Sequence, residues 1–176
     1  MGKLVLCLVG LPYMLHPRSS IFYKISSSCF VKSTPIVLSF LRSEFVSNNS
    51  YYFCHDPTIA LKIFDDFKRD GYPSSVAGYE VESIRYLGEP GYDSLTADKK
   101  PKLATSKSSP MLTLRFKNGC VVQLRASGTE PKFKYYIEMR GEPGVSRDEV
   151  EKELVQMSRL VLEDICQPEQ NGLVVP

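Results

Sequence analysis

The sequence predicts an α+β domain in which a small, mostly antiparallel sheet carries helices on one face. Three observations predict this class. Segments in which apolar and polar residues alternate follow one another between residues 79 and 140. The dipeptide Asn118-Gly119, between two of these segments, is typical of a hairpin turn. Segments with a helical spacing of apolar residues stand on both sides of this region, so helices can cover the sheet.

The first predicted helix covers residues 57–69. Asp56 is a favourable N-cap, and Pro57 suits the first helical position because the nitrogen there has no intrahelical partner. Asp70-Gly71 favours an end to the helix. The apolar residues between these signals recur on one face: Ile59, Ile63 and Phe67.

The next elements are strands. Residues 79–87 form a β-rich segment, and the polar stretch after it, with the charged run at 98–101, is interpreted as a solvated loop. Asn118-Gly119 supplies the two positive φ values of a type I′ turn, so we expect a hairpin there. Its two arms are marked by alternating apolar residues: Leu112, Leu114 and Phe116, then Val122 and Leu124.

The last strand and the last helix complete the domain, with three or four strands in all. Residues 133–140 alternate, and four of them are expected to face the core: Phe133, Tyr135, Ile137 and Met139. Ser146 and Glu149 form a capping box. An apolar stripe then continues toward Pro168, which predicts a helix over 147–166 that packs on the sheet.

Composition excludes several classes of function. The 176 residues include 22 basic and 20 acidic ones, a net charge of +2, so no overall field favours nucleic acid or an anionic membrane. His16 and His55 lack the spacing of a metal site or a catalytic triad. A disulfide framework or zinc site is not expected either, because the cysteines are odd in number and form no CxxC pair: Cys7, Cys29, Cys54, Cys120 and Cys166.

The chain divides into four parts. Residues 1–45 show no sustained period and are expected to be disordered or foreign to the fold; 46–74 should be a connecting helical segment from a preceding domain. The domain itself covers 75–168, and 169–176 form a tail. The apolar run from Leu4 to Leu15 resembles a signal-peptide core but is too short to span a bilayer. A cytoplasmic location is expected, with secretion left as an alternative.

Residues 125–132, Arg-Ala-Ser-Gly-Thr-Glu-Pro-Lys, carry the groups that a phosphate needs. Arg125 offers a planar fork of donors, Ser127 and Thr129 offer hydroxyls, and Gly128 lets backbone N–H groups approach an anion. No histidine or second carboxylate stands beside Ser127 to activate it as a nucleophile.

Two lysines and an acid extend this segment. Lys132 and Lys134 add positive charge. Glu130 would repel a phosphate, so it is expected to face away or to orient Arg125 or a lysine. On residue types and spacing alone, an ordinary turn between two strands explains the segment as well as a phosphate site does.

The segment resembles the phosphate-binding loop in the fourth domain of α-D-phosphohexomutases. The resemblance continues through Lys134-Tyr135-Tyr136, upstream through residues 106–111 and downstream at Gln167-Pro168. It points to the branch of phosphoglucomutase-2, phosphopentomutase and glucose-1,6-bisphosphate synthase, and it runs from about Val46 to the C-terminus. It implies a phosphoglucomutase C-terminal domain with a TBP-like fold.

The resemblance also implies a function. Such enzymes are cytosolic intramolecular phosphotransferases that use Mg²⁺ and glucose 1,6-bisphosphate, and their fourth domain holds the phosphate of the sugar phosphate, of ribose or glucose, that does not react. Five residues of this chain would contact it: Arg125, Ser127, Gly128, Thr129 and, less closely matched to the family, Lys134.

Other parts of the family pattern are missing. No segment resembles its phosphoserine, metal or sugar-recognition loops, so the sequence gives no catalytic residue, metal ligand or cofactor of its own. A partial mutase that is inactive alone is therefore expected. A non-catalytic module that binds sugar phosphates or regulates the enzyme remains the alternative.

Overall fold

The protein is described by a computed structural model that covers residues 43–176. The expectations for residues 1–42, including the signal-like run and His16, lie outside the described residues. The elements, in chain order, are β1 (Phe45–Phe53), α2 (Pro57–Lys68), β2 (Ser75–Val76), β3 (Tyr79–Tyr86), β4 (Tyr92–Asp93), β5 (Met111–Phe116), β6 (Cys120–Ala126), β7 (Lys132–Arg140) and α3 (Arg147–Cys166).

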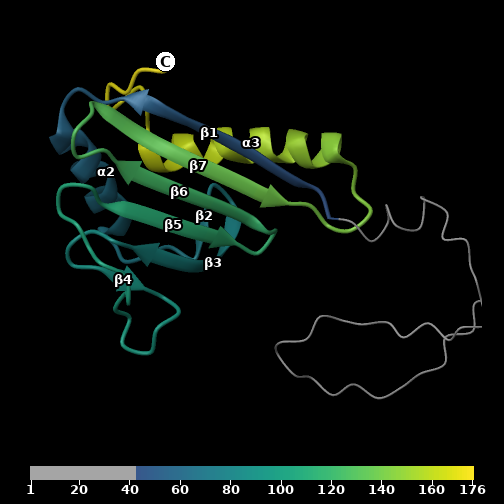
Figure 1. Cartoon of the computed structure of the whole chain (residues 1–176), viewed down its shortest axis with the longest axis horizontal. Helices are drawn as coiled ribbons and strands as arrows, with labels where there is room; N and C mark the ends of the chain where they lie inside the picture. Colours follow the sequence, from purple (N-terminus) through teal and green to yellow (C-terminus); the bar gives the residue numbers. More distant parts are fainter. Residues whose placement is uncertain (1–42) are drawn as a thin grey trace, which may run out of the picture. The chain divides into compact units, whose positions relative to one another are not determined.

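The strands form one antiparallel sheet, and the predicted α+β class is confirmed. The described residues contain seven strands in the order β1-β7-β6-β5-β3-β2, with β4 paired to β3, where the sequence predicted three or four. Every strand pair is antiparallel. Helix α3 packs against β1 and β7, while α2 contacts β6 (Figure 1).

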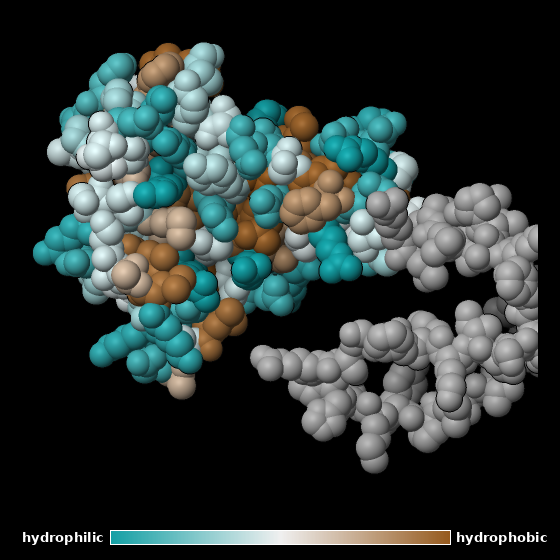
Figure 2. Space-filling view, viewed as in Figure 1, coloured by the Kyte–Doolittle hydropathy of each residue, from teal (hydrophilic) through white to brown (hydrophobic). Residues whose placement is uncertain are grey.

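The core lies between one face of the sheet and the helices. Alternate residues of β6 are buried, as are Phe133, Ile137 and Met139 of β7, whereas Tyr135 is only half-buried. The helices close this core with their own apolar faces: Ala60, Ile63 and Phe64 from α2, and Val150, Leu154, Met157, Val161 and Ile165 from α3. On the opposite face, which we call the open face, Ser83 of β3 and Thr113 of β5 are buried, whereas Arg125 of β6 and Lys134 and Tyr136 of β7 reach solvent. In Figure 2 hydrophilic residues predominate over smaller hydrophobic patches.

The segment 46–74 contains a strand as well as the predicted helix. Strand β1 pairs with β7 from Phe45, opposite Arg140, to Phe53, opposite Lys132, so this segment is part of the sheet and not only a connection. The predicted tail is also attached, because Val174 forms a bridge with Phe53. Both contacts join residues far apart in the chain, which local periodicity does not reveal.

The predicted hairpin is present, but its turn differs from the one expected. Gly119 has a φ of +82°, whereas Asn118 is not among the residues with positive φ, so the turn is not type I′. The loop has three residues between Phe116 and Cys120, and the Gly119 N–H donates to Phe116 O at 3.1 Å. A three-residue loop requires the left-handed conformation only at its last position, which the glycine supplies.

Both predicted helices begin at the residues that the sequence indicated. The Asp56 carboxylate accepts a hydrogen bond from Thr58 N at 2.8 Å. Ser146 and Glu149 form the capping box of α3. Strand β4 lies in the stretch predicted as a polar loop, where the buried Asp93 forms an ion pair at 2.7 Å with the partly exposed Arg85. Within residues 43–176, no helix is long and apolar enough to cross a membrane.

Candidate functional site

The hairpin register brings two loops together at one end of the sheet. Met111, at the start of β5, lies opposite Arg125, at the end of β6, so the segments beyond them leave the sheet side by side. Ala126 N donates to Pro110 O at 3.2 Å, and Ser109 Oγ donates to Ala126 O at 2.8 Å. We call residues 106–110 the support loop and residues 125–132 the anion loop.

The backbone of Gly128 lies close to the support loop. A Cβ at this position would lie 3.2 Å from the carbonyl oxygen of Ser108, closer than an ordinary van der Waals contact. The φ of Gly128 is not in the left-handed region, so the backbone conformation itself does not demand glycine. The glycine is therefore explained by the contact with the support loop.

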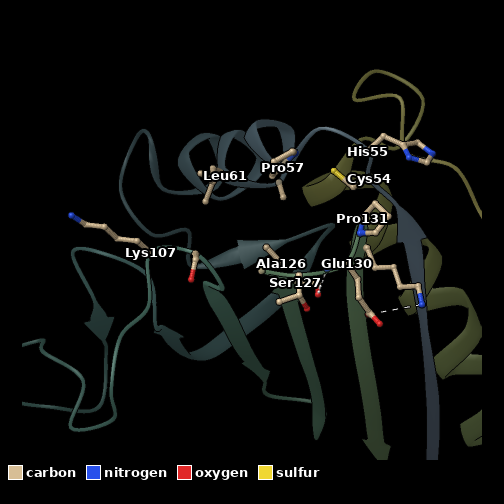
Figure 3. A pocket seen from close by; sticks show the side chains of 14 residues that line it. Cys54, His55, Pro57, Leu61, Lys107, Ala126, Ser127, Glu130 and Pro131 are labelled. Carbon is tan, nitrogen blue, oxygen red and sulfur yellow. Dashed lines mark hydrogen bonds and ion pairs between the residues drawn. The ribbon is translucent and has the colours of Figure 1, made fainter.

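A cavity of about 390 Å³ lies between the anion loop, the support loop and the start of α2. Figure 3 shows Pro57 and Leu61 of α2 on one side and Ala126 and Ser127 on the other. Lys107 extends away from both, and its ammonium pairs with Glu89 at 3.3 Å. The remaining lining residues of the anion loop are Gly128, Thr129, Glu130, Pro131 and Lys132.

The structure divides the five predicted phosphate contacts into two groups. Ser127, Gly128 and Thr129 line the cavity together. Arg125 and Lys134 do not line it; they lie opposite each other on neighbouring strands, on the open face of the sheet. An anion that contacts all five would have to sit over the tip of the anion loop, between the cavity and the open face.

The anion loop offers backbone donors that nothing else uses. Within residues 43–176, no hydrogen bond is recorded from the N–H of Gly128 or of Thr129. Ser127 fastens the loop by accepting a bond from Glu130 N at 3.2 Å, which leaves its own proton to donate. Consecutive unpaired N–H groups in a loop form a concave site that suits an anion.

Glu130 orients the lysines and does not contact Arg125. Its carboxylate pairs with Lys134 Nζ at 2.9 Å and lies 3.9 Å from Lys132 Nζ. The hydrogen bond from Lys134, followed by the charge of Lys132, lowers the pKa of Glu130, and the same bond raises the pKa of Lys134. Both groups are therefore charged near neutral pH, and Lys134 is engaged before any ligand arrives.

The side chain of Arg125 is exposed, and its guanidinium forms no ion pair with an acidic side chain of residues 43–176. Its Nε donates to Ser109 Oγ at 3.1 Å. Among residues 43–176, no carboxylate forms an ion pair with it. The charge of Arg125 is therefore available to an external anion.

A second cavity, of about 300 Å³, adjoins the first on the open face. Glu130 and Lys132 line both cavities, and the ammonium of Lys132 lies 4.7 Å from the centre of the Tyr51 ring. The other residues that line it are Asn49, Ser50, Tyr51, Lys134 and Tyr136. The open face beside the anion loop is thus cationic and aromatic.

The resemblance included residues 106–111, but sequence reasoning assigned no place in the site to the support loop or to the residues before α2. Lys107, Ser108, Cys54 and His55 all line the first cavity. The register of the predicted hairpin contained the signal for the support loop, since residues just before 111 must lie beside those just after 125. No local pattern identified Cys54 or His55, which reach the site through the pairing of β1 with β7.

The thiol and the hydroxyl at the first cavity have no activating base beside them within residues 43–176. Burial raises the pKa of the Cys54 thiol, so it is protonated and a poor nucleophile. No histidine or carboxylate bonds to the hydroxyl of Ser127 within residues 43–176. Residues 43–176 also include no group of three or more His, Cys, Asp or Glu side chains that could hold a metal ion.

The chain is similar to several curated proteins whose names refer to sugar phosphates. The chain is 40% identical to human phosphopentomutase over 133 residues, and 39% identical to glucose 1,6-bisphosphate synthase of Mus musculus over 134 residues. It is also 33% identical over 137 residues to a probable phosphoribomutase of Schizosaccharomyces pombe. No family model matches the chain.

These matches cover most of this chain but a small part of each relative. The alignment with human phosphopentomutase covers 73% of the chain and 22% of that enzyme. The corresponding shares are 73% and 21% for the mouse synthase, and 75% and 23% for the yeast protein. The chain therefore spans about a fifth of the length of these relatives.

Proposed function

Because the matched part of the chain belongs to the phosphopentomutase and glucose 1,6-bisphosphate synthase branch of the α-D-phosphohexomutases, we propose that it is the phosphate-holding domain of a sugar-phosphate mutase. In this role it binds the phosphate of the substrate that does not react. The substrates are the phosphates of ribose or glucose. The N–H groups of Gly128 and Thr129, which have no hydrogen-bond partner within residues 43–176, are the observation that carries the proposal.

The anion loop supplies three kinds of donor to a phosphate. The N–H groups of Gly128 and Thr129 and the hydroxyl of Ser127 donate from the tip of the loop. The guanidinium of Arg125 adds charge and a planar fork that matches phosphate oxygens. Lys134 adds a further cation once the phosphate competes with Glu130 for it.

Holding the phosphate is a binding role. In this proposal the described residues carry out no phosphoryl transfer. Ser127 has no base beside it, and no metal site stands nearby. We infer that the chain alone is inactive as a mutase. An assay of ribose 1-phosphate conversion to ribose 5-phosphate, with Mg²⁺ and glucose 1,6-bisphosphate present, should show no turnover; turnover by the purified chain would refute this part of the proposal.

Calorimetric titration of glucose 1,6-bisphosphate into the full chain tests the binding role. Because the site is open on one side, we expect a dissociation constant on the order of 1 mM. Arg125→Ala should abolish binding. Arg140→Ala is the matched control, since Arg140 is also an exposed arginine of the sheet but lies at the other end of β7, and it should leave binding unchanged.

Two results would contradict or modify the proposal. Absence of binding by the wild-type chain, or binding that survives Arg125→Ala, would remove the phosphate-holding role. A dissociation constant on the order of 1 μM would instead favour an independent binding or regulatory module, because an incomplete site should not reach that affinity.

A further inference from the structure

Ser109 connects the support loop to both parts of the anion loop. Its Oγ donates to the carbonyl of Ala126 at 2.8 Å and accepts a hydrogen bond from Arg125 Nε at 3.1 Å. We infer that Ser109 is a positioning residue that orients the guanidinium of Arg125 toward the bound phosphate. This inference rests on the phosphate-holding role proposed above.

The chemistry of a hydroxyl suits this position. A serine hydroxyl has one proton to donate and two lone pairs that accept. The proton is used on the Ala126 carbonyl, which fixes the oxygen and turns a lone pair toward Arg125. A side chain that only donates, or only accepts, could not make both bonds.

The bond to Nε determines which donors Arg125 has left. A guanidinium carries five N–H bonds, and only the one on Nε is used by Ser109. Within residues 43–176, no acceptor is recorded for the four N–H bonds of the terminal nitrogens. The two terminal nitrogens can therefore donate parallel hydrogen bonds to two phosphate oxygens at once, the arrangement typical of arginine and phosphate.

Orientation before binding should improve affinity. An exposed arginine samples many rotamers, and ordering them on binding opposes association. The bond from Nε to a half-buried serine restricts those rotamers in advance. Ser109 thus acts on the phosphate through Arg125 and does not need to touch it.

The serine is itself held in place. Ser109 N donates to Ser106 Oγ at 3.2 Å, and Ser106 N donates to Leu87 O at 3.0 Å, which ties the support loop to the end of β3. On the other side, Ala126 N donates to Pro110 O at 3.2 Å. The position of the hydroxyl is therefore set by backbone contacts that remain when the side chain is changed.

Three variants of the full chain test the inference, with inorganic phosphate and glucose 1,6-bisphosphate as probes and titration followed by NMR. Ser109→Ala should weaken binding about fivefold to tenfold, in the range of one lost orienting hydrogen bond. Ser109→Thr keeps the hydroxyl and should bind within about twofold of wild type. Arg125→Ala is the third variant and should abolish binding, so it sets the upper limit of what the loss of Ser109 can cost, because the serine acts only through the arginine.

A spectroscopic signal separates positioning from a general structural effect. The Nε–Hε resonance of Arg125 should be protected from solvent exchange in the wild-type chain and in Ser109→Thr, and should lose that protection in Ser109→Ala. The backbone amide spectrum away from the two loops should stay the same. If Ser109→Ala does not fold, the Thr variant and the wild-type Nε–Hε resonance still decide the matter, since an unprotected resonance in the folded wild type overturns the inference.

The outcomes separate this inference from the function on which it rests. If the wild-type chain binds neither probe, or if Arg125→Ala binds normally, the phosphate-holding role fails and the inference fails with it. If Arg125→Ala abolishes binding while Ser109→Ala binds like the wild type, the phosphate-holding role stands and the positioning role of Ser109 is refuted.

Discussion

Replacement of Gly128 by alanine separates binding from folding at the anion loop. The new Cβ would lie 3.2 Å from Ser108 O, so the two loops must move apart by a few tenths of an ångström. Ser108 is exposed and can move. Because the φ of Gly128 is outside the left-handed region, alanine also reduces the entropy of the unfolded chain, which stabilises by about 0.4–1 kcal/mol.

These opposing terms predict a small change in stability and a large change in binding. The free energy of unfolding should change by less than about 1 kcal/mol, since the steric cost and the entropic gain are of similar size. Binding of phosphate should weaken by roughly 10-fold to 100-fold, because the loss of one hydrogen bond to a charged group costs about 1.5–3 kcal/mol. Thr129 is the next residue in the chain, so its N–H group is the donor that a shift of the loop displaces most directly from the phosphate.

Urea denaturation and phosphate titration of Gly128→Ala measure the two quantities separately. Unchanged affinity with unchanged stability would refute the reasoning, because it would mean that the amides at the tip of the loop do not hold the anion. A loss of stability of about 3 kcal/mol or more would also refute it, since the contact with Ser108 would then be required for folding.

Two further substitutions and one labelling experiment test other parts of the structure. Glu130→Gln frees Lys134 from its ion pair, so it should strengthen phosphate binding roughly twofold to fivefold in a titration at low salt; weaker binding would mean that Glu130 holds Lys134 in its productive position. Ser146→Ala removes the capping box of α3 and should lower the free energy of unfolding by about 1 kcal/mol in urea denaturation, and an unchanged midpoint would contradict the role of the cap. Burial raises the pKa of Cys120 and of Cys166 to about 12, so both should resist iodoacetamide at pH 8 in the native chain and react in urea; rapid native labelling of either, mapped by peptide mass spectrometry, would contradict that burial.

Elements defined by neighbouring residues could be predicted from the sequence. The capping box of α3, the proline at the start of α2 and the hairpin at Asn118-Gly119 depend on residues within a few positions of one another. Strand β1 could not be predicted in this way. Its centre is polar, at Asn48-Asn49, and its partners in β7 lie between 79 residues (Phe53 to Lys132) and 95 residues (Phe45 to Arg140) further along the chain, so only the folded sheet identifies it.

The candidate site follows the same division. The residue types of the anion loop indicated an anion site, but not the face of the sheet on which each side chain lies. The sequence left open whether Glu130 would face away or orient Arg125 or a lysine, and the structure pairs it with Lys134. Ser109 gained a role only when the hairpin brought it beside Arg125, because its partners are 16 and 17 residues away.

Amide chemical shifts during a titration of glucose 1,6-bisphosphate into the ¹⁵N-labelled full chain test the central claim most directly. We expect the largest shifts at Gly128 and Thr129, smaller ones across residues 125–134, and their disappearance in Arg125→Ala. A folded spectrum without shifts in this segment, or with its main shifts elsewhere, would contradict the claim that the anion loop holds the phosphate.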